Sequence, residues 1–214
     1  MTRYSPDSAS ASPPPWESGL VRLAPRLREA FLRHRYNTDS LLEVLGEDGH
    51  AALGRGEPVP VRRIAANAGQ IGVLIRLLLI GDDCPRADAA AALAPVDIGE
   101  AVAAGLLEAD GDSVRAALDV RPVDLGSGTR WMISDLDGSM RSHALDSGVA
   151  AHDHVLGVGH ASLSLLRATP TAEVGDVLDI GTGCGIQAVH AAAYANTVTA
   201  TDVSARALEF AAAG

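Results

Sequence analysis

The chain has 214 residues, of which 47% are hydrophobic, and its formal net charge is −10 at pH 7. This excess of negative charge argues against a protein that binds nucleic acid mainly by electrostatic attraction. The length allows one or two domains. The longest apolar run, residues 71–80, is interrupted by Arg76 and is about half of the ~20 residues that a membrane span needs, so no membrane association is predicted.

The start of the chain and its cysteines predict a cytoplasmic protein. Residues 1–17 are polar and Pro-rich with no secretory signal, and residues 1–16 are expected to form a disordered tail. Cys84 and Cys184 are far apart and fit no metal-ligand spacing, so both are predicted to be free thiols in a reducing compartment.

Two helices are expected next. Residues 18–35 carry an apolar stripe at helical spacing, and because Pro25 interrupts it, the regular helix is expected to begin there. Its arginine-rich face fits a solvated face of a packed helix better than a basic interaction helix. Thr38 or Asp39 is expected to cap a short helix that ends at Leu45. The following stretch to Pro60 is predicted to be mostly loop, with one helical turn around residues 50–53.

A winged-helix-like module is predicted over residues 70–123. Helices are expected over residues 70–80, 88–93 and 97–104, and an Asp-Gly turn inside residues 106–116 indicates a hairpin. The hairpin is expected to continue through residues 118–123, with one more strand at residues 131–134. Three short helices followed by a hairpin resemble a winged helix. The acidic charge favours a dimerisation or substrate module over a DNA-binding one.

No metal site is predicted. Asp135 to Gly138 suggest a calcium loop, but Ala144 stands where the loop would need a glutamate, so a turn is the better interpretation. His143, His152, His154 and His160 form a loose cluster without the close spacing of a deliberate metal site.

The stretch from Val177 to Gly185 is the strongest motif. It combines a buried strand, a turn with glycines at 181, 183 and 185, and a helix from Ile186 to about Tyr194; a second strand, residues 198–201, then ends at Asp202. Glycines permit a positive φ and the close approach of a ligand, and an acid at the end of the next strand can accept hydrogen bonds from ribose hydroxyls.

Two cofactors compete for this motif. A dinucleotide fingerprint is satisfied by Gly183, Gly185 and Ala188, whereas Asp179 with the three glycines forms the pattern acid-x-G-x-G-x-G. A carboxylate at the end of a buried strand is costly without a partner and would repel a pyrophosphate. It suits the ammonium and sulfonium groups of S-adenosyl-L-methionine, so we favour this cofactor.

These residues resemble the class I S-adenosylmethionine-dependent methyltransferases. The amino-acid sequence from Leu178 to Ala188 is typical of the group with a small methyltransferase domain. This group includes release-factor glutamine methyltransferases and rRNA guanine-N2 methyltransferases. The resemblance implies that Asp179 holds the methionine amino end. It also implies that Gly181, Thr182 and Gly183 line the methionine and ribose. The remaining cofactor-binding candidates that it implies are Gly185, Asp202 and Val203.

The segment from Asp153 to Gly159 precedes a helix expected over residues 161–168. In methyltransferases that resemble this chain, such a segment covers the cofactor from the far side, and Gly157 and Gly159 would allow that approach. A simple interdomain linker fits the same residues equally well.

The expected fold class is α/β: an N-terminal helical, winged-helix-like α+β module over residues 17–145, then the first βαβα part of a Rossmann-like seven-stranded sheet over residues 146–214. Because two strands cannot bury both faces of such a sheet, the chain is expected to be a fragment. The group's Asn-Pro-Pro-aromatic tetrapeptide is absent from the sequence, so no catalytic residue is assigned.

The expected function is methyl transfer from S-adenosyl-L-methionine to a nitrogen of a macromolecule, either an RNA base or a protein glutamine, with a homodimer formed through the N-terminal module. The alternatives are an NAD(P)-dependent oxidoreductase and a non-catalytic winged-helix module with a regulatory or dimerisation role.

Overall fold

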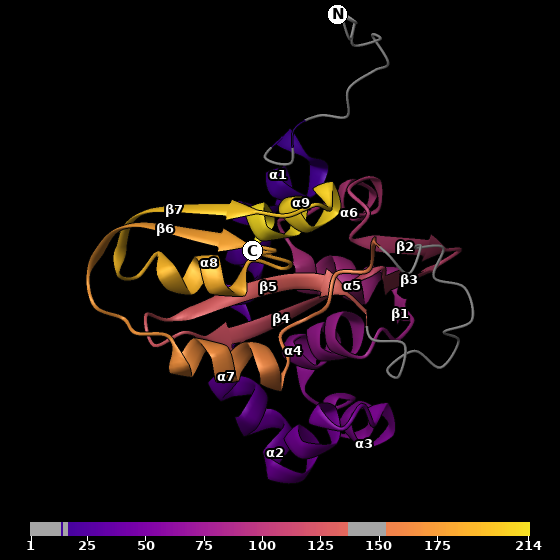
Figure 1. The fold of residues 1–214 in the computed structure, drawn as a ribbon. Coiled ribbons are helices and arrows are strands. Elements are labelled where there is room, and N and C mark those ends of the chain that lie inside the picture. The colour runs from indigo at the N-terminus through magenta and orange to yellow at the C-terminus, as the bar shows by residue number, and fades with distance from the viewer. Residues whose placement is uncertain (1–13, 15–16, 137–152) are drawn as a thin grey trace, which may run out of the picture.

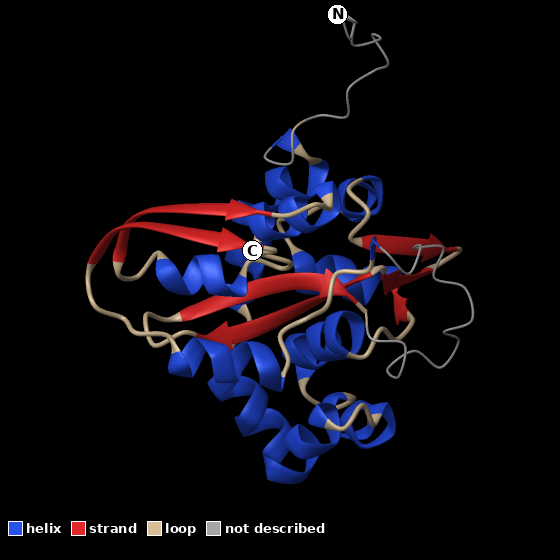
Figure 2. Cartoon of the chain, viewed as in Figure 1, coloured by secondary structure: helices blue, strands red, loops and turns tan. Residues whose placement is uncertain are grey.

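A computed structural model describes residue 14, residues 17–136 and residues 153–214. The described chain is mixed α/β, and its strands form three separate small sheets set among helices (Figures 1 and 2). The following predictions lie outside the described residues: the tail apart from residue 14, the boundary between residues 145 and 146, and the positions Gly138, His143, Ala144 and His152. No helix within the described ranges has the length and apolarity that a membrane crossing requires.

Helix α1 (Gly19–Arg33) begins six residues before Pro25, so the predicted start at the proline is wrong. The Ser18 hydroxyl accepts a hydrogen bond from the Val21 N–H at 3.1 Å and caps the helix. Leu20, Leu23, Leu27 and Phe31 are all buried. The burial of this stripe outweighs the single backbone hydrogen bond that the proline removes.

Helix α2 (Thr38–Gly54) contains a break at Gly46, where φ is +64°, so the predicted short helix to Leu45 is followed directly by a second helical stretch. Its cap is Asn37 rather than Thr38 or Asp39, because the Asn37 side chain accepts from the Ser40 N–H at 2.9 Å. Helix α3 (Pro58–Ala65) was not predicted; it begins on a proline, which has the φ that a first helical turn needs.

The next elements follow the order helix, strand, helix, helix, hairpin. These elements are α4 (Gly69–Leu74), η2 (Ile75–Leu79), β1 (Cys84–Pro85), α5 (Arg86–Leu93), α6 (Ile98–Ala103), β2 (Leu107–Asp110) and β3 (Ser113–Ala116). The predicted core helix is present as α4 with a π-helical continuation, η2, whose four leucine and isoleucine side chains are buried. The predicted hairpin is β2 with β3, turned at Gly111, and β1 joins β3 to complete an antiparallel sheet of order β1-β3-β2.

Strand β4 (Leu118–Asp124) does not continue the hairpin as predicted. It pairs antiparallel with β5 (Thr129–Asp135) over seven residue pairs and forms a sheet of its own. Tyr36 fixes this pair to the N-terminal helices, because its hydroxyl donates to the Val120 carbonyl at 2.8 Å and its own carbonyl accepts from the Trp131 indole N–H at 2.7 Å.

The last part of the chain contains a parallel strand pair with a helix on one face. Strand β6 (Val174–Ile180) pairs with β7 (Ala195–Thr201), and α8 (Ile186–Ala191) contacts both strands from one side (Figure 1). The predicted helix ends earlier, and the predicted second strand starts three residues earlier. No residue of β6 is buried, so the prediction of a buried strand is wrong: within the described ranges only α8 covers the strand pair, and on the opposite face Leu178 and Ile180 are exposed. Helices α7 (His160–Ala168) and α9 (Ala205–Ala213) complete the chain, and α9 packs against α1 and β5.

Candidate functional site

The turn between β6 and α8 requires glycine at three positions. Gly181, Gly183 and Gly185 have φ values of +74°, +55° and +85°. L-residues with a side chain rarely adopt this left-handed region, so the spacing that the sequence shows is what the backbone needs.

The three glycines serve different purposes. A Cβ added to Gly181 or Gly183 would meet nothing within 4 Å, so open space lies above the first half of the turn. A Cβ on Gly185 would lie 2.8 Å from Ala211 Cβ and 3.0 Å from Ala211 Cα. The first two glycines therefore leave room for a ligand, and the third allows α9 to pack against the turn.

Two carboxylates lie at the carboxyl edge of the parallel pair, where ligands of open α/β sheets bind. Asp179 pairs with Ala200 in the register of β6 and β7, and Asp202 directly follows β7. The Thr182 hydroxyl donates to Asp179 Oδ2 at 2.7 Å, and the Gly183 N–H donates to Asp202 Oδ2 at 2.9 Å. Both acids are thus held against the turn.

Asp202 is ionised at neutral pH. Backbone N–H groups, first that of Ser204 and then those of Gly183 and Val203, donate hydrogen bonds to the carboxylate and lower the pKa of Asp202 below its ordinary value. The neighbouring Val203 side chain is fully exposed, so an apolar surface lies beside the charge. The combination offers hydrogen-bond acceptors and an apolar contact to one ligand.

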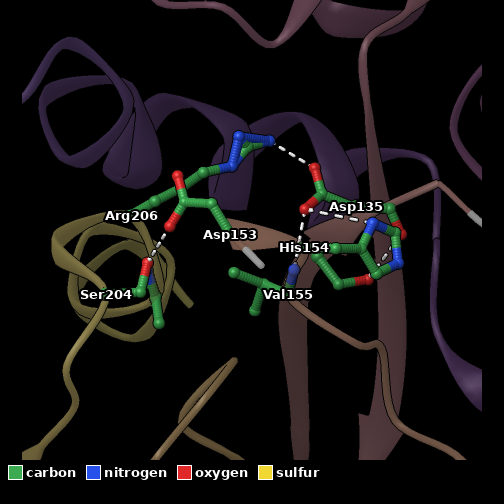
Figure 3. A network of polar contacts seen from close by, with 8 residues as sticks. Asp135, Asp153, His154, Val155, Ser204 and Arg206 are labelled. Carbon is green, nitrogen blue, oxygen red and sulfur yellow. Dashed lines mark hydrogen bonds and ion pairs between the residues drawn. The ribbon is translucent and has the colours of Figure 1, made fainter. Parts of the chain in front are cut away.

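The segment before α7 begins beside this edge. The Ser204 hydroxyl donates to Asp153 Oδ1 at 2.6 Å (Figure 3). The Ser204 N–H donates to Asp202 Oδ1 at 3.0 Å. Ser204 also caps α9, because its Oγ accepts from the Ala207 N–H. Asp153 is therefore joined to Asp202 through one residue.

The two glycines of this segment lie elsewhere. A Cβ on Gly157 would be 2.8 Å from Ser134 Oγ of β5, and Gly159 precedes the first residue of α7 with open space around it. Both line a cavity of about 340 Å³ formed with the end of α2 and with β4 and β5, and no residue of the glycine turn lines this cavity. The structure brings Asp153, rather than these glycines, into hydrogen-bonding contact with the edge of the sheet.

Sequence reasoning missed the ion pair that joins β5 to α9. Asp135 is 8% exposed, and its carboxylate contacts the Arg206 guanidinium on one oxygen (Figure 3). Its other oxygen accepts the Val155 N–H at 2.8 Å and lies 3.6 Å from His154 Nδ1. The buried acid thus connects β5, the segment at residues 154–155 and α9. The sequence pattern around Asp135 predicts only a turn and gives no sign of these contacts.

Neither cysteine is set up as a nucleophile. Burial raises the pKa of the Cys84 thiol to about 11 and raises the pKa of Cys184 above its ordinary value. Within the described ranges the cysteines are free, and no group of three or more potential ligands is placed to hold a metal ion.

The comparisons with known proteins concern the N-terminal region. A family described as a domain of unknown function (DUF7059) matches residues 33–117, which span α2 to β3. No curated protein matches the chain. The matched region ends well before the glycine turn, so it carries no information about the edge of the β6–β7 pair.

Proposed function

We propose that the edge formed by the glycine turn, Asp179 and Asp202 binds S-adenosyl-L-methionine, and that the chain is part of a methyltransferase acting on a nitrogen of an RNA or a protein. The observation that carries this proposal is the pair of carboxylates at the carboxyl edge of the two parallel strands, each hydrogen-bonded to a turn whose first two glycines face open space.

Each residue has a definite task in this proposal. Asp202, ionised and with acceptor capacity left, would take the two ribose hydroxyls, and Val203 would contact the base. Asp179 would face the methionine ammonium, while Gly181 and Gly183 permit close approach. When bound, the cofactor supplies an electrophilic methyl group. The chain's contribution is positioning, which accounts for much of the barrier reduction in such reactions.

The hydrogen bonds of the turn favour this cofactor over a dinucleotide. The N–H groups of Gly181 and Thr182 both donate to the Thr201 carbonyl, at 2.8 and 2.9 Å, and the Gly183 N–H is taken by Asp202. A pyrophosphate is usually held by free N–H groups at such a turn. Three of them are already used within the protein, so we favour a ligand without phosphate.

The decisive experiment is equilibrium binding of S-adenosylhomocysteine by calorimetry. We expect saturable binding, at least tenfold weaker in Asp179→Ala and in Asp202→Ala, because a lost charge-assisted hydrogen bond costs about 1.5–3 kcal/mol. The matched control is Asp176→Ala, an exposed carboxylate on the same strand, which should bind normally. Tight binding of NAD that ignores Asp179 would instead establish the oxidoreductase alternative.

A second proposal concerns the module predicted over residues 70–123, without β4, which belongs to another sheet; we interpret residues 70–116 as a winged-helix-like module for protein contacts. Its support is the order of α4, β1, α5, α6 and the β2–β3 hairpin within one antiparallel sheet. The tip of the hairpin carries Asp110 and Asp112, both exposed, which would repel a phosphate backbone.

We therefore expect no retardation of a mixed-sequence duplex at physiological salt in a gel-shift assay, and a dimeric mass by sedimentation equilibrium. Retention of DNA at micromolar protein would overturn the assignment to protein contacts. A strictly monomeric mass would contradict the proposed homodimer.

A further inference from the structure

The cavity that Gly157 and Gly159 line contains a charged pair from an otherwise apolar part of β4. The Arg121 guanidinium donates a hydrogen bond to Asp119 Oδ2 at 3.1 Å, and both side chains line the cavity. The Asp119 side chain is 9% exposed and that of Arg121 is 32% exposed. The other residues from Leu118 to Val123 are apolar and buried. The only charges of this buried stretch therefore lie at the cavity.

Strand geometry brings the polar groups of the cavity to one face of the β4–β5 pair. Side chains two residues apart on a strand point to the same side, so Asp119 and Arg121 share a face. Ser134 joins them there, because it is the cross-strand partner of Asp119. Gly157 lies directly against this face, since an added Cβ would be 2.8 Å from Ser134 Oγ. Three apolar side chains also line the cavity: Leu53, Leu156 and Val158.

The second carboxylate at the cavity is neutralised from outside it. Asp135 forms its ion pair with Arg206 of α9, and His154 Nδ1 lies 3.6 Å from the same carboxylate. The pair of Asp119 and Arg121 is neutral as well, so the cavity holds opposite charges in balance. Replacing a buried ion pair with apolar residues is often neutral or stabilising, so stability alone does not account for these charges in β4.

We propose that this cavity binds a free α-amino acid with an apolar side chain, its ammonium group at Asp119 and its carboxylate at Arg121. A zwitterion keeps the cavity neutral, whereas a ligand with a single charge would leave that charge unbalanced in a largely buried site. Both charges of an α-amino acid are attached to one carbon, so they lie close together as those of the pair do. The pair can hold a ligand while it stays paired, because a carboxylate accepts about four hydrogen bonds and a guanidinium donates five.

The size and the place of the cavity fit this ligand. Its volume of about 340 Å³ is at the lower end of the range for small-molecule sites, which suits an amino acid better than a nucleotide. No residue of the glycine turn lines the cavity, so the proposal does not depend on the cofactor proposed for that turn.

Calorimetric titration of the whole chain with L-leucine tests the proposal, and we expect saturable binding to a single site. L-Leucinamide lacks the carboxylate and N-acetyl-L-leucine lacks the ammonium group, so each should bind at least about tenfold more weakly. Asp119→Asn and Arg121→Gln each remove one charge but keep a polar side chain, and should weaken leucine binding by a similar factor. The control Arg63→Ala removes a charge from an exposed position of α3 and should bind normally.

Gly159→Leu separates binding in the cavity from adsorption to the surface. The φ of Gly159 is −113° and an added Cβ meets nothing within 4 Å, so the new side chain fits without strain and takes up space at the cavity. It should abolish leucine binding while circular dichroism shows an intact fold. Leucinamide binding as tightly as leucine, leucine binding unchanged in Gly159→Leu, or no saturable binding at millimolar leucine would overturn the proposal.

Competition with S-adenosylhomocysteine shows whether the cavity is a separate site. Excess S-adenosylhomocysteine should not displace leucine, because the cavity and the glycine turn share no residue. Displacement would mean that the amino-acid end of the cofactor occupies the cavity, and the proposal of a site for a free amino acid would then be wrong.

Discussion

Replacing Asp135 with alanine is expected to lower the free energy of unfolding by about 3–5 kcal/mol, the range for removing one partner of a buried ion pair. The carboxylate is buried, and the substitution leaves the Arg206 side chain, 24% exposed, without its acid. The Nε of Arg206 is already buried without a partner among the described residues, so only the contact of its guanidinium with the Phe210 ring would remain. The Val155 N–H would lose its acceptor as well. Chemical denaturation followed by circular dichroism measures the change.

Two comparisons isolate the cause. Asp135→Asn keeps an acceptor for the Val155 N–H but removes the charge. It should therefore lower the free energy of unfolding, but by less than Asp135→Ala does. Glu29→Ala breaks an exposed pair with Arg33, whose side chains are 47% and 58% exposed, and should cost no more than about 1 kcal/mol. If Asp135→Ala were as mild as Glu29→Ala, the ion pair with Arg206 would not be a structural link between β5 and α9.

This link shows where sequence reasoning stops. Asp135 and Arg206 are 71 residues apart, and no local pattern associates them. The glycine turn was predictable because each left-handed residue needs glycine whatever surrounds it. The cap at Ser204 is likewise a local feature, because its side chain satisfies a backbone group within its own helix.

The errors in the predicted elements have one physical source. Local signals suggested that Pro25 begins α1 and that β4 extends the preceding hairpin, but tertiary contacts decided both. The buried stripe of α1 carries the helix across the proline, and β4 finds its partner in β5 through a full antiparallel register. Pairing partners and buried faces are properties of the assembled chain.

The candidate site divides in the same way. Sequence alone placed Asp179, Asp202 and the glycines correctly around one turn, because parallel strands bring their carboxyl ends to one edge. It did not reveal that Ser204 joins Asp202 to Asp153, or that the N–H groups of the turn are already bonded. In the proposed function, these contacts favour a ligand without phosphate over a dinucleotide.

Gly185→Ala is expected to cost about 3 kcal/mol of stability, from about 1–2 kcal/mol for a left-handed alanine and a further 1–3 kcal/mol for overpacking. The reason is geometric: φ is +85°, and the new Cβ would lie 2.8 Å from Ala211 Cβ and 3.0 Å from its Cα. Because the second contact is backbone, α9 must move away from the turn. Thermal and chemical denaturation of the purified variant measure the loss.

Gly181→Ala is the matched comparison, because it also forces an alanine to a positive φ, +74°, but its Cβ meets nothing within 4 Å. We expect Gly181→Ala to lower the free energy of unfolding by only about 1–2 kcal/mol, the cost of an alanine in the left-handed conformation. Adding Ala211→Gly to Gly185→Ala removes the nearer clash and should recover part of the stability. Equal losses for the two single variants would mean that α9 does not pack closely on the turn.

Binding of S-adenosylhomocysteine should be weakened more by Gly181→Ala than by Gly185→Ala, since the Gly181→Ala methyl group enters the space that the proposed ligand uses. A substitution that is mild for folding but severe for binding would separate the part of the turn that contacts the ligand from the part that supports it.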